Sequence, residues 1–151
     1  MTAHQQRVLR TAYRLLGRME DAQDACQEVF LRLLRNLDTL DGDPAAWLYR
    51  VTVNVCHDQH RRKLVAVELP DRADPGPGAD RLLELDERKA LLMAGLATLA
   101  ERERAAVVLR DVEGLTTREV AAILGVEEVT VRSQICGARM KLAKFVRGSK
   151  C

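Results

Sequence analysis

Apolar residues recur at intervals of three and four along most of the chain, which is the spacing of one face of an α-helix. The clearest run predicts a helix from Asp21 to Leu37. Its apolar stripe, which we expect to be buried in the core of the domain, consists of Ala22, Ala25, Cys26, Val29, Phe30, Leu33, Leu34 and Leu37. A shorter run of the same kind comes before it and stops at Gly17, a residue type that commonly ends helices. The pattern predicts two amphipathic helices at the start of the chain.

A third helix is predicted after Pro44, because proline is favoured at the first helical position and Asp43 can serve as the N-cap. The β-branched run from Val51 to Val53 would also suit a strand. However, an apolar stripe that starts at Trp47 continues at helical spacing to about residue 62. We therefore favour a helix for the whole segment.

The second half of the sequence predicts helices near Glu87–Leu99 and Glu101–Val112. A short helix follows, and the sequence TTRE that begins at Thr116 fits the capping box of its first turn. Gly125 then indicates a tight turn before the last helix, near Glu128–Val146. Two short helices joined in this way predict a helix-turn-helix.

The stretch between the two helical halves has a different composition. Pro70–Asp80 contains three of the four prolines and two glycines, which predicts an exposed linker. We therefore expect an all-α chain of two small helical domains, 1–63 and 86–151, joined by a flexible linker over 64–85. The C-terminal domain is the helix-turn-helix one. We expect the two domains to move partly independently of each other.

Composition agrees with this fold and limits the function. Hydrophobic residues make up 47% of the 151 positions and aromatic residues only 3%, which favours helices packed through aliphatic side chains. No run reaches the ~18 apolar residues of a membrane span, so we expect a cytoplasmic protein without membrane insertion. The four cysteines are widely spaced and predict no disulfide framework. The net charge of +2 supports nucleic-acid binding only weakly.

The polar face of the last helix is a candidate DNA-reading surface. It exposes Val129, Arg132, Ser133, Cys136 and Lys144, with Thr130 and Gly137 on its flank. An arginine beside small hydroxyl residues near a helix N-terminus suits base edges and phosphates in a major groove. The alternative is the solvated face of an ordinary bundle helix.

The helix after Pro44 carries a second polar stripe. Its members are Arg50, Asn54, His57, Asp58 and Arg61, and the basic end continues with Arg62. An asparagine can bind a base edge, while arginine and histidine can bind phosphate or stack on an unpaired base. Such a stripe can also be a solvated face with intrahelical pairs such as Asn54–Asp58.

The helix from Asp21 to Leu37 has a free face of its own. It presents Asp24, Gln27, Glu28, Leu31 and Arg35. A leucine beside polar and acidic residues is typical of a protein-docking surface, although single exposed leucines are also ordinary.

Catalytic and metal chemistry find little support. Cys56, His57 and His60 could suggest zinc, but they are too few and lie in a segment that is already explained as a helix. We find no glycine-rich phosphate loop and no nucleophile elbow. We therefore expect no metal, no cofactor and no enzymatic activity.

Two long segments resemble the extracytoplasmic-function (ECF) sigma factors of bacterial RNA polymerase. Region 2 of that family is similar to YRLLGRMEDAQDACQEVFLRLLRNL followed by WLYRVTVNVCHDQHRRK. Region 4 is similar to LATLAERERAAVVLRDVEGLTTREVAAILGVEEVTVRSQICGARMKL. The resemblance implies a protein that directs core polymerase to specific promoters, recognises their −10 and −35 elements and melts the DNA. It also implies an anti-sigma factor as a further partner.

The resemblance assigns a role to each surface. It implies that Asp24, Gln27, Glu28 and Leu31 bind the clamp helices of the β′ subunit. The −10 element would be bound by Arg50, Asn54, His57, Arg61 and Arg62, with Asn54 lining the pocket for a flipped base. Trp47 would be the packing tryptophan at the start of this helix. The −35 element would be bound by Thr130, Arg132, Ser133, Cys136 and Gly137.

This sequence departs from the family at several of these positions. The family commonly has larger residues at Cys136 and Gly137, and often a basic residue at Gln134, so the −35 sequence cannot be inherited from relatives. Glu127 also stands where a better N-cap is usual.

Two other functions compete with the sigma factor. One is a two-part transcriptional regulator with a sensory or dimerising front half. The other is a protein-interaction module that holds its DNA-binding faces masked. In a two-part regulator the front half would not bind core polymerase, whereas in a sigma factor it would. The docking face with Leu31 favours a front half that binds polymerase.

Overall fold

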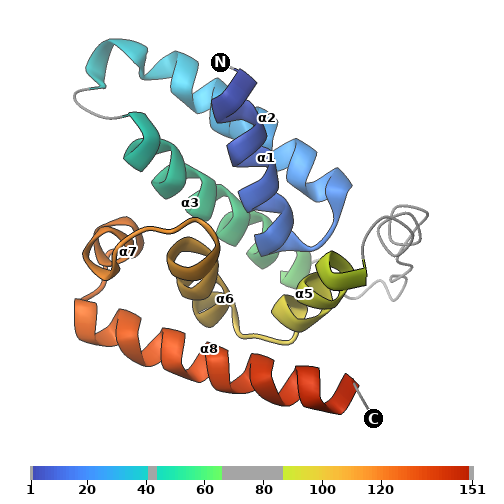
Figure 1. Cartoon of the computed structure of the whole chain (residues 1–151). Coiled ribbons are helices and arrows are strands. Elements are labelled where there is room, and N and C mark those ends of the chain that lie inside the picture. The colour runs from blue at the N-terminus through green and yellow to red at the C-terminus, as the bar shows by residue number, and fades with distance from the viewer. Residues whose placement is uncertain (1, 41–43, 66–86, 150–151) are drawn as a thin grey trace.

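The computed structural model describes residues 2–40, 44–65 and 87–149, and every regular element within them is helical. Three α-helices and a 3-10 helical turn form an N-terminal unit, and the remaining elements form a C-terminal unit (Figure 1). This confirms the predicted all-α class. Within the described residues no helix is long and apolar enough to cross a membrane.

The N-terminal unit consists of α1 (Thr2–Leu16), α2 (Met19–Arg35), the 3-10 helical turn η1 (Leu37–Thr39) and α3 (Pro44–Val65), and its three α-helices pack against one another. Gly17 takes a φ of +84° between α1 and α2, a conformation in which a side chain would be strained. The predicted end of the first helix at this glycine is therefore confirmed. The segment Val51–Val53 is helical and buried, which rules out the strand. The proposed N-cap, Asp43, lies outside the described residues.

The apolar stripe predicted for α2 is buried over only part of its length. Ala22, Ala25 and Val29 are fully buried, whereas Leu34 is 63% exposed and Leu37 is 54% exposed. The helix also ends at Arg35, two residues before the predicted end, so Leu37 lies in η1, and the expectation that Leu34 and Leu37 belong to the core is wrong. Periodicity shows which face of a helix is apolar, but α1 and α3 do not cover the end of that face.

The C-terminal unit consists of five elements. They are α5 (Glu87–Ala97), α6 (Glu101–Val107), the π-helical turn η2 (Val108–Val112), α7 (Thr117–Leu124) and α8 (Glu128–Ser149). Figure 1 shows α5, α6 and α7 between α8 and the N-terminal helices. The predicted helix near Glu101–Val112 is thus an α-helix that widens into a π turn.

The helix-turn-helix is confirmed in its local details. The Thr116 hydroxyl accepts from the Glu119 N–H at 3.0 Å, and the Glu119 carboxylate accepts from the Thr116 N–H at 2.8 Å. Gly125 has a φ of +70° at the end of α7. Val131, Ile135 and other residues of α8 then bury its apolar face against α6 and α7. The capping box and the glycine turn could both be predicted because each depends on residues close together in the sequence.

The two units are in direct contact. Helices α1 and α3 of the N-terminal unit pack against α5, α6, η2 and α7 of the C-terminal unit. The Arg104 guanidinium in α6 donates to the Leu15 carbonyl in α1 at 2.8 Å, and Glu113 binds side chains from α1 and α3. This arrangement departs from the expected independent movement of the units. Most of the predicted linker lies outside the described residues, whereas Leu64 and Val65 belong to α3.

Candidate nucleic-acid and polymerase interfaces

The first turns of α8 present the predicted DNA-reading surface. Thr130, Arg132, Ser133 and Cys136 are exposed, as predicted. The Arg132 guanidinium lies 3.4 Å from the Glu128 carboxylate one turn earlier, a surface pair that costs little to break. The side chain is therefore free to exchange this partner for DNA.

A groove runs beside these residues and adds positive charge to the surface. It is lined by Arg110, Thr117, Arg132, Ile135, Cys136, Arg139, Met140 and Ala143. The Asp111 carboxylate binds the Arg139 guanidinium at 2.6 and 2.9 Å, and this contact lowers the pKa of Asp111. Part of the charge of Arg139 is thus balanced within the protein. The sequence did not predict that Arg110 and Arg139 belong to this surface, because their positions depend on how α8 crosses the end of α6.

Gly137 does not share the open surface of α8. It is half-buried, and a side chain here would begin 2.9 Å from a carboxylate oxygen of Glu103 in α6. That carboxylate accepts a hydrogen bond from Lys141 at 2.8 Å. The missing side chain at Gly137 therefore makes room for the contact between α6 and α8, which corrects the expectation of an outward-facing position.

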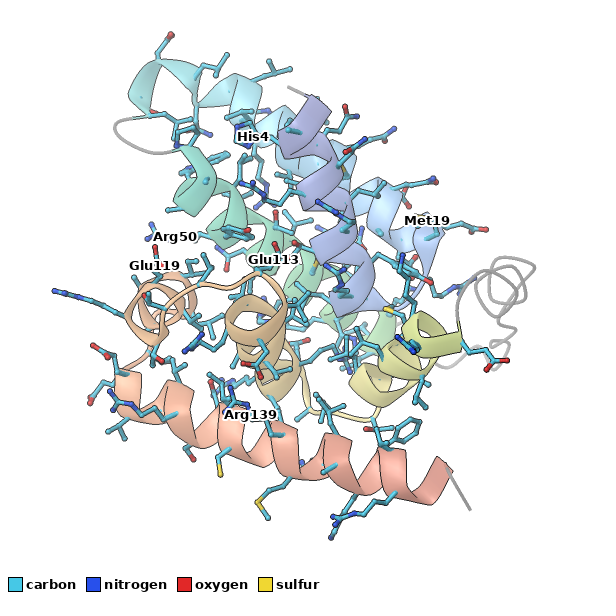
Figure 2. All side chains as sticks on the ribbon, viewed as in Figure 1. His4, Met19, Arg50, Glu113, Glu119 and Arg139 are labelled. Atoms are coloured by element: carbon cyan, nitrogen blue, oxygen red, sulfur yellow. The ribbon has the colours of Figure 1, made fainter. Side chains whose placement is uncertain are left out.

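The predicted −10 stripe on α3 is only partly open. Arg50, Asn54, Arg61 and Arg62 are exposed. Arg50 projects from α3 on the side where α7 lies (Figure 2). His57 is half-buried, and its Nδ1 lies 3.7 Å from the Glu101 carboxylate of α6. Burial lowers the pKa of His57, although nearby Glu101 acts in the opposite direction.

The intrahelical ion pair on this face of α3 differs from the pair expected from the sequence. The Arg61 guanidinium donates to the Asp58 carboxylate at 2.6 Å, whereas a solvated face was expected to pair Asp58 with Asn54. Asn54 is exposed, and the nearby ion pair joins Asp58 to Arg61 instead. Trp47 is half-buried and packs against the core of its unit, as the resemblance implied.

The free face of α2 is wider and more apolar than predicted. Asp24, Gln27 and Leu31 are exposed, and the Glu28 carboxylate accepts from the Arg32 guanidinium at 2.9 Å. Leu34 follows Leu31 by three positions, so the two side chains neighbour each other on the helix surface. Sequence periodicity assigned Leu34 to the core and so missed it.

The cysteine and histidines of α3 do not form a metal site in the structure. Among the described residues there is no group of three or more histidine, cysteine or acidic side chains that could hold a metal ion. Burial, followed by the charge of Glu101, raises the pKa of Cys56 to about 12. A thiol of this kind is a poor metal ligand at neutral pH, because the thiolate is the form that binds.

Comparison with known proteins identifies the family. The sigma-70 region 2 model matches residues 1–64, and the sigma-70 region 4 model matches residues 89–142. The chain is 33% identical to the ECF RNA polymerase sigma-E factor of Escherichia coli K12 over 134 residues, which are 79% of this chain and 70% of that protein. The chain belongs to the ECF sigma factors.

Other similarities agree with this assignment. The chain is 39% identical over 150 residues to the ECF sigma factor SigE of Mycolicibacterium smegmatis and covers 95% of itself but 58% of that relative. The structure of the Bartonella quintana sigma factor RpoE in complex with the anti-sigma factor NepR matches 97% of this chain and 93% of that one, with a TM-score of 0.78. At 19% identity, this likeness shows the fold. The sigma-70 region 2 match falls on the N-terminal unit, and the region 4 match falls on the C-terminal unit.

Proposed function

We propose that this ECF sigma factor directs core RNA polymerase to specific promoters, binds their −10 and −35 elements and initiates transcription by melting the DNA. The observation that carries the proposal is the presence of three separate exposed surfaces in one chain that matches both sigma regions. One is apolar and acidic, and the other two are basic and polar. Such a set suits one protein partner and two stretches of DNA.

The surface of α2 is the proposed dock for the β′ clamp helices of polymerase. Leu31 and Leu34 supply the apolar contact, while Asp24 and Glu28 supply negative charge for a basic partner. Apolar contacts near the centre of an interface contribute most of the affinity, and charges mainly set the rate and orientation of approach. Gln27 adds a hydrogen-bonding group at the edge of this surface.

The surface of α3 is the proposed site for the melted −10 element. The exposed Asn54 amide can bind the edge of a base turned out of the stack. Arg50, Arg61 and Arg62 can bind the backbone phosphates of the same strand. In the closed arrangement of the two units, His57 faces Glu101, so it joins this surface only when α6 is withdrawn.

The surface of α8 is the proposed −35 site. Arg132 can donate two hydrogen bonds to a guanine edge in the major groove, and Thr130 and Ser133 can bind phosphate or base. Cys136 is small, which leaves room for a base at the centre of the helix surface. Gly137 is left out because it faces α6.

We infer that the protein has no catalytic chemistry of its own, because RNA synthesis belongs to the polymerase. A partner of the polymerase would act in the cytoplasm. An anti-sigma factor is a further proposed partner. The alternative of a two-part regulator with a sensory front half is less favoured, because the front half matches sigma region 2 over residues 1–64.

Abortive transcription with purified core polymerase and a randomised promoter library tests this function. We expect initiation on a subset of templates that share two motifs at a fixed spacing, and none with core polymerase alone. A regulator would bind DNA but give no initiation with core polymerase, which would refute the proposal.

A further inference from the structure

Glu113 lies at the junction of the two units, directly after the π turn η2 (Figure 2). One carboxylate oxygen accepts from the Tyr49 hydroxyl of α3 at 2.8 Å. The other accepts from the Thr11 hydroxyl of α1 at 3.1 Å and from the Arg14 guanidinium of α1 at 3.2 Å. Thus all three donors come from the N-terminal unit, while the acceptor comes from the C-terminal unit.

The three donors form a pocket, which we call the carboxylate pocket (Thr11, Arg14 and Tyr49). Thr11 is fully buried, Tyr49 is 8% exposed, and the Glu113 side chain is 11% exposed. A carboxylate is held in such surroundings only if hydrogen bonds and an opposite charge replace the water it loses. The pocket supplies both, so it is well suited to a single acidic side chain.

A second polar contact supports the first. The Arg104 guanidinium of α6 donates to the carbonyls of Leu96 and Leu99 in its own unit and to that of Leu15 in α1, each at 2.8 Å. Leu15 lies in the last turn of α1, where carbonyl groups lack partners within the helix. Arg104 therefore ties the end of α1 to the C-terminal unit.

The closed arrangement covers part of the surface that we assign to the −10 element. Helix α7 packs against α3, and Glu101 of α6 faces His57 and His60 of α3. The Nε2 atom of His57 is buried and has no hydrogen-bond partner among the described residues. DNA could reach this part of α3 only if α6 moved away.

Promoter geometry also requires the units to separate. Elements centred at −10 and −35 lie about 25 base pairs apart, which is about 85 Å at 3.4 Å per base pair. A compact chain of this length has a radius of gyration of about 15 Å. While the units are in contact, α3 and α8 cannot both reach their elements. This step rests on the proposed function.

We propose that the carboxylate pocket captures Glu113 and thereby holds the free protein closed, with the −10 surface of α3 partly covered until the pocket releases it. The contact is a latch within one chain. A state that binds both promoter elements must break it, so the apparent affinity for the promoter is the intrinsic affinity multiplied by the open fraction.

Small-angle X-ray scattering of the free full-length protein tests the latch without assuming a sigma function. The test variants are Glu113→Ala, which removes the acceptor from one unit, and Tyr49→Phe, which removes a donor hydroxyl from the other and keeps the ring. The control is Glu87→Gln. It lowers the negative charge of the C-terminal unit at an exposed position at the start of α5, away from the pocket.

We expect a radius of gyration of about 15 Å for the wild type and the control. Both test variants should increase it by about 3–5 Å, because separated units fill a larger volume. A wild type that is already extended, or test variants as compact as the control, would overturn the proposal. If Glu113→Ala unfolds by circular dichroism, Tyr49→Phe decides the outcome.

The same proteins also separate this proposal from the proposed function. If Tyr49→Phe is open in scattering but neither it nor the wild type initiates transcription, the result supports the latch proposal and refutes the proposed sigma function. A compact Tyr49→Phe variant with normal initiation by the wild type would refute the latch alone. If both proposals hold, the open variants should bind a single-stranded −10 oligonucleotide about tenfold more tightly than the control.

Discussion

Leu31 and Leu34 on α2 are 46% and 63% exposed, which allows an estimate of what docking would gain from them. Complete burial of a leucine contributes about 1.5–3 kcal/mol, so covering the exposed part of Leu31 contributes about 1 kcal/mol. Leu31→Ala should weaken binding to core polymerase about fivefold. Leu31→Asp also forces a carboxylate out of water, so we expect a loss of about a hundredfold or more.

The assay is equilibrium binding of the fluorescently labelled protein to core polymerase, with thermal unfolding of each variant measured in parallel. Leu64→Asp is the matched control, because Leu64 is 61% exposed at the end of α3, outside the proposed docking surface. Unfolding free energies of the Leu31 variants should stay within about 0.5 kcal/mol of the wild type. Normal polymerase binding by Leu31→Asp would refute the docking surface, and unfolding would show that Leu31 supports the core.

Three further predictions concern the two DNA-binding surfaces and the latch. Asn54→Ala should reduce open-complex formation more than polymerase binding, as measured by heparin-resistant complexes, because the amide contacts only the melted strand; equal losses would contradict this. Arg132→Ala should cost about 1–3 kcal/mol of −35 binding and relax the preference at one base pair, whereas a uniform loss across sequences would indicate a phosphate contact. Burial and the hydrogen bond to Glu113 raise the pKa of Tyr49 to about 12, so the closed form holds this proton more tightly than an open form with a pKa of about 10. The latch should therefore be intact below about pH 10 and weaken as the pH rises towards 12, seen as expansion in scattering; no pH dependence in that range would contradict it.

Local sequence patterns predicted the helices and the helix-turn-helix because the interactions that define them are local. The capping box at Thr116 joins residues three positions apart, and Gly125 ends α7 through its own backbone conformation. Candidate surfaces on α8 and α3 followed from the same periodicity. Their exposure could be predicted wherever the opposite face of the helix was clearly apolar.

The parts that could not be predicted depend on contacts between distant residues. Glu113 binds Thr11 from 102 positions away, and no local pattern indicates that the two meet. Likewise, helical spacing predicts an outward-facing Gly137, whereas the crossing of α6 and α8 places Glu103 against it. Leu34 was assigned to the core because periodicity shows that a face is apolar, but not which helix covers it.

Permanganate footprinting of promoter DNA tests the central claim most directly, because it detects unpaired thymines in a melted region. With core polymerase and this protein together, we expect reactive thymines around the −10 element of a selected promoter. Neither component alone should produce them, and Asn54→Ala should reduce them. Protection of the −35 element without any reactive thymines, in the presence of core polymerase, would show a DNA-binding protein that does not open promoters and would contradict the account.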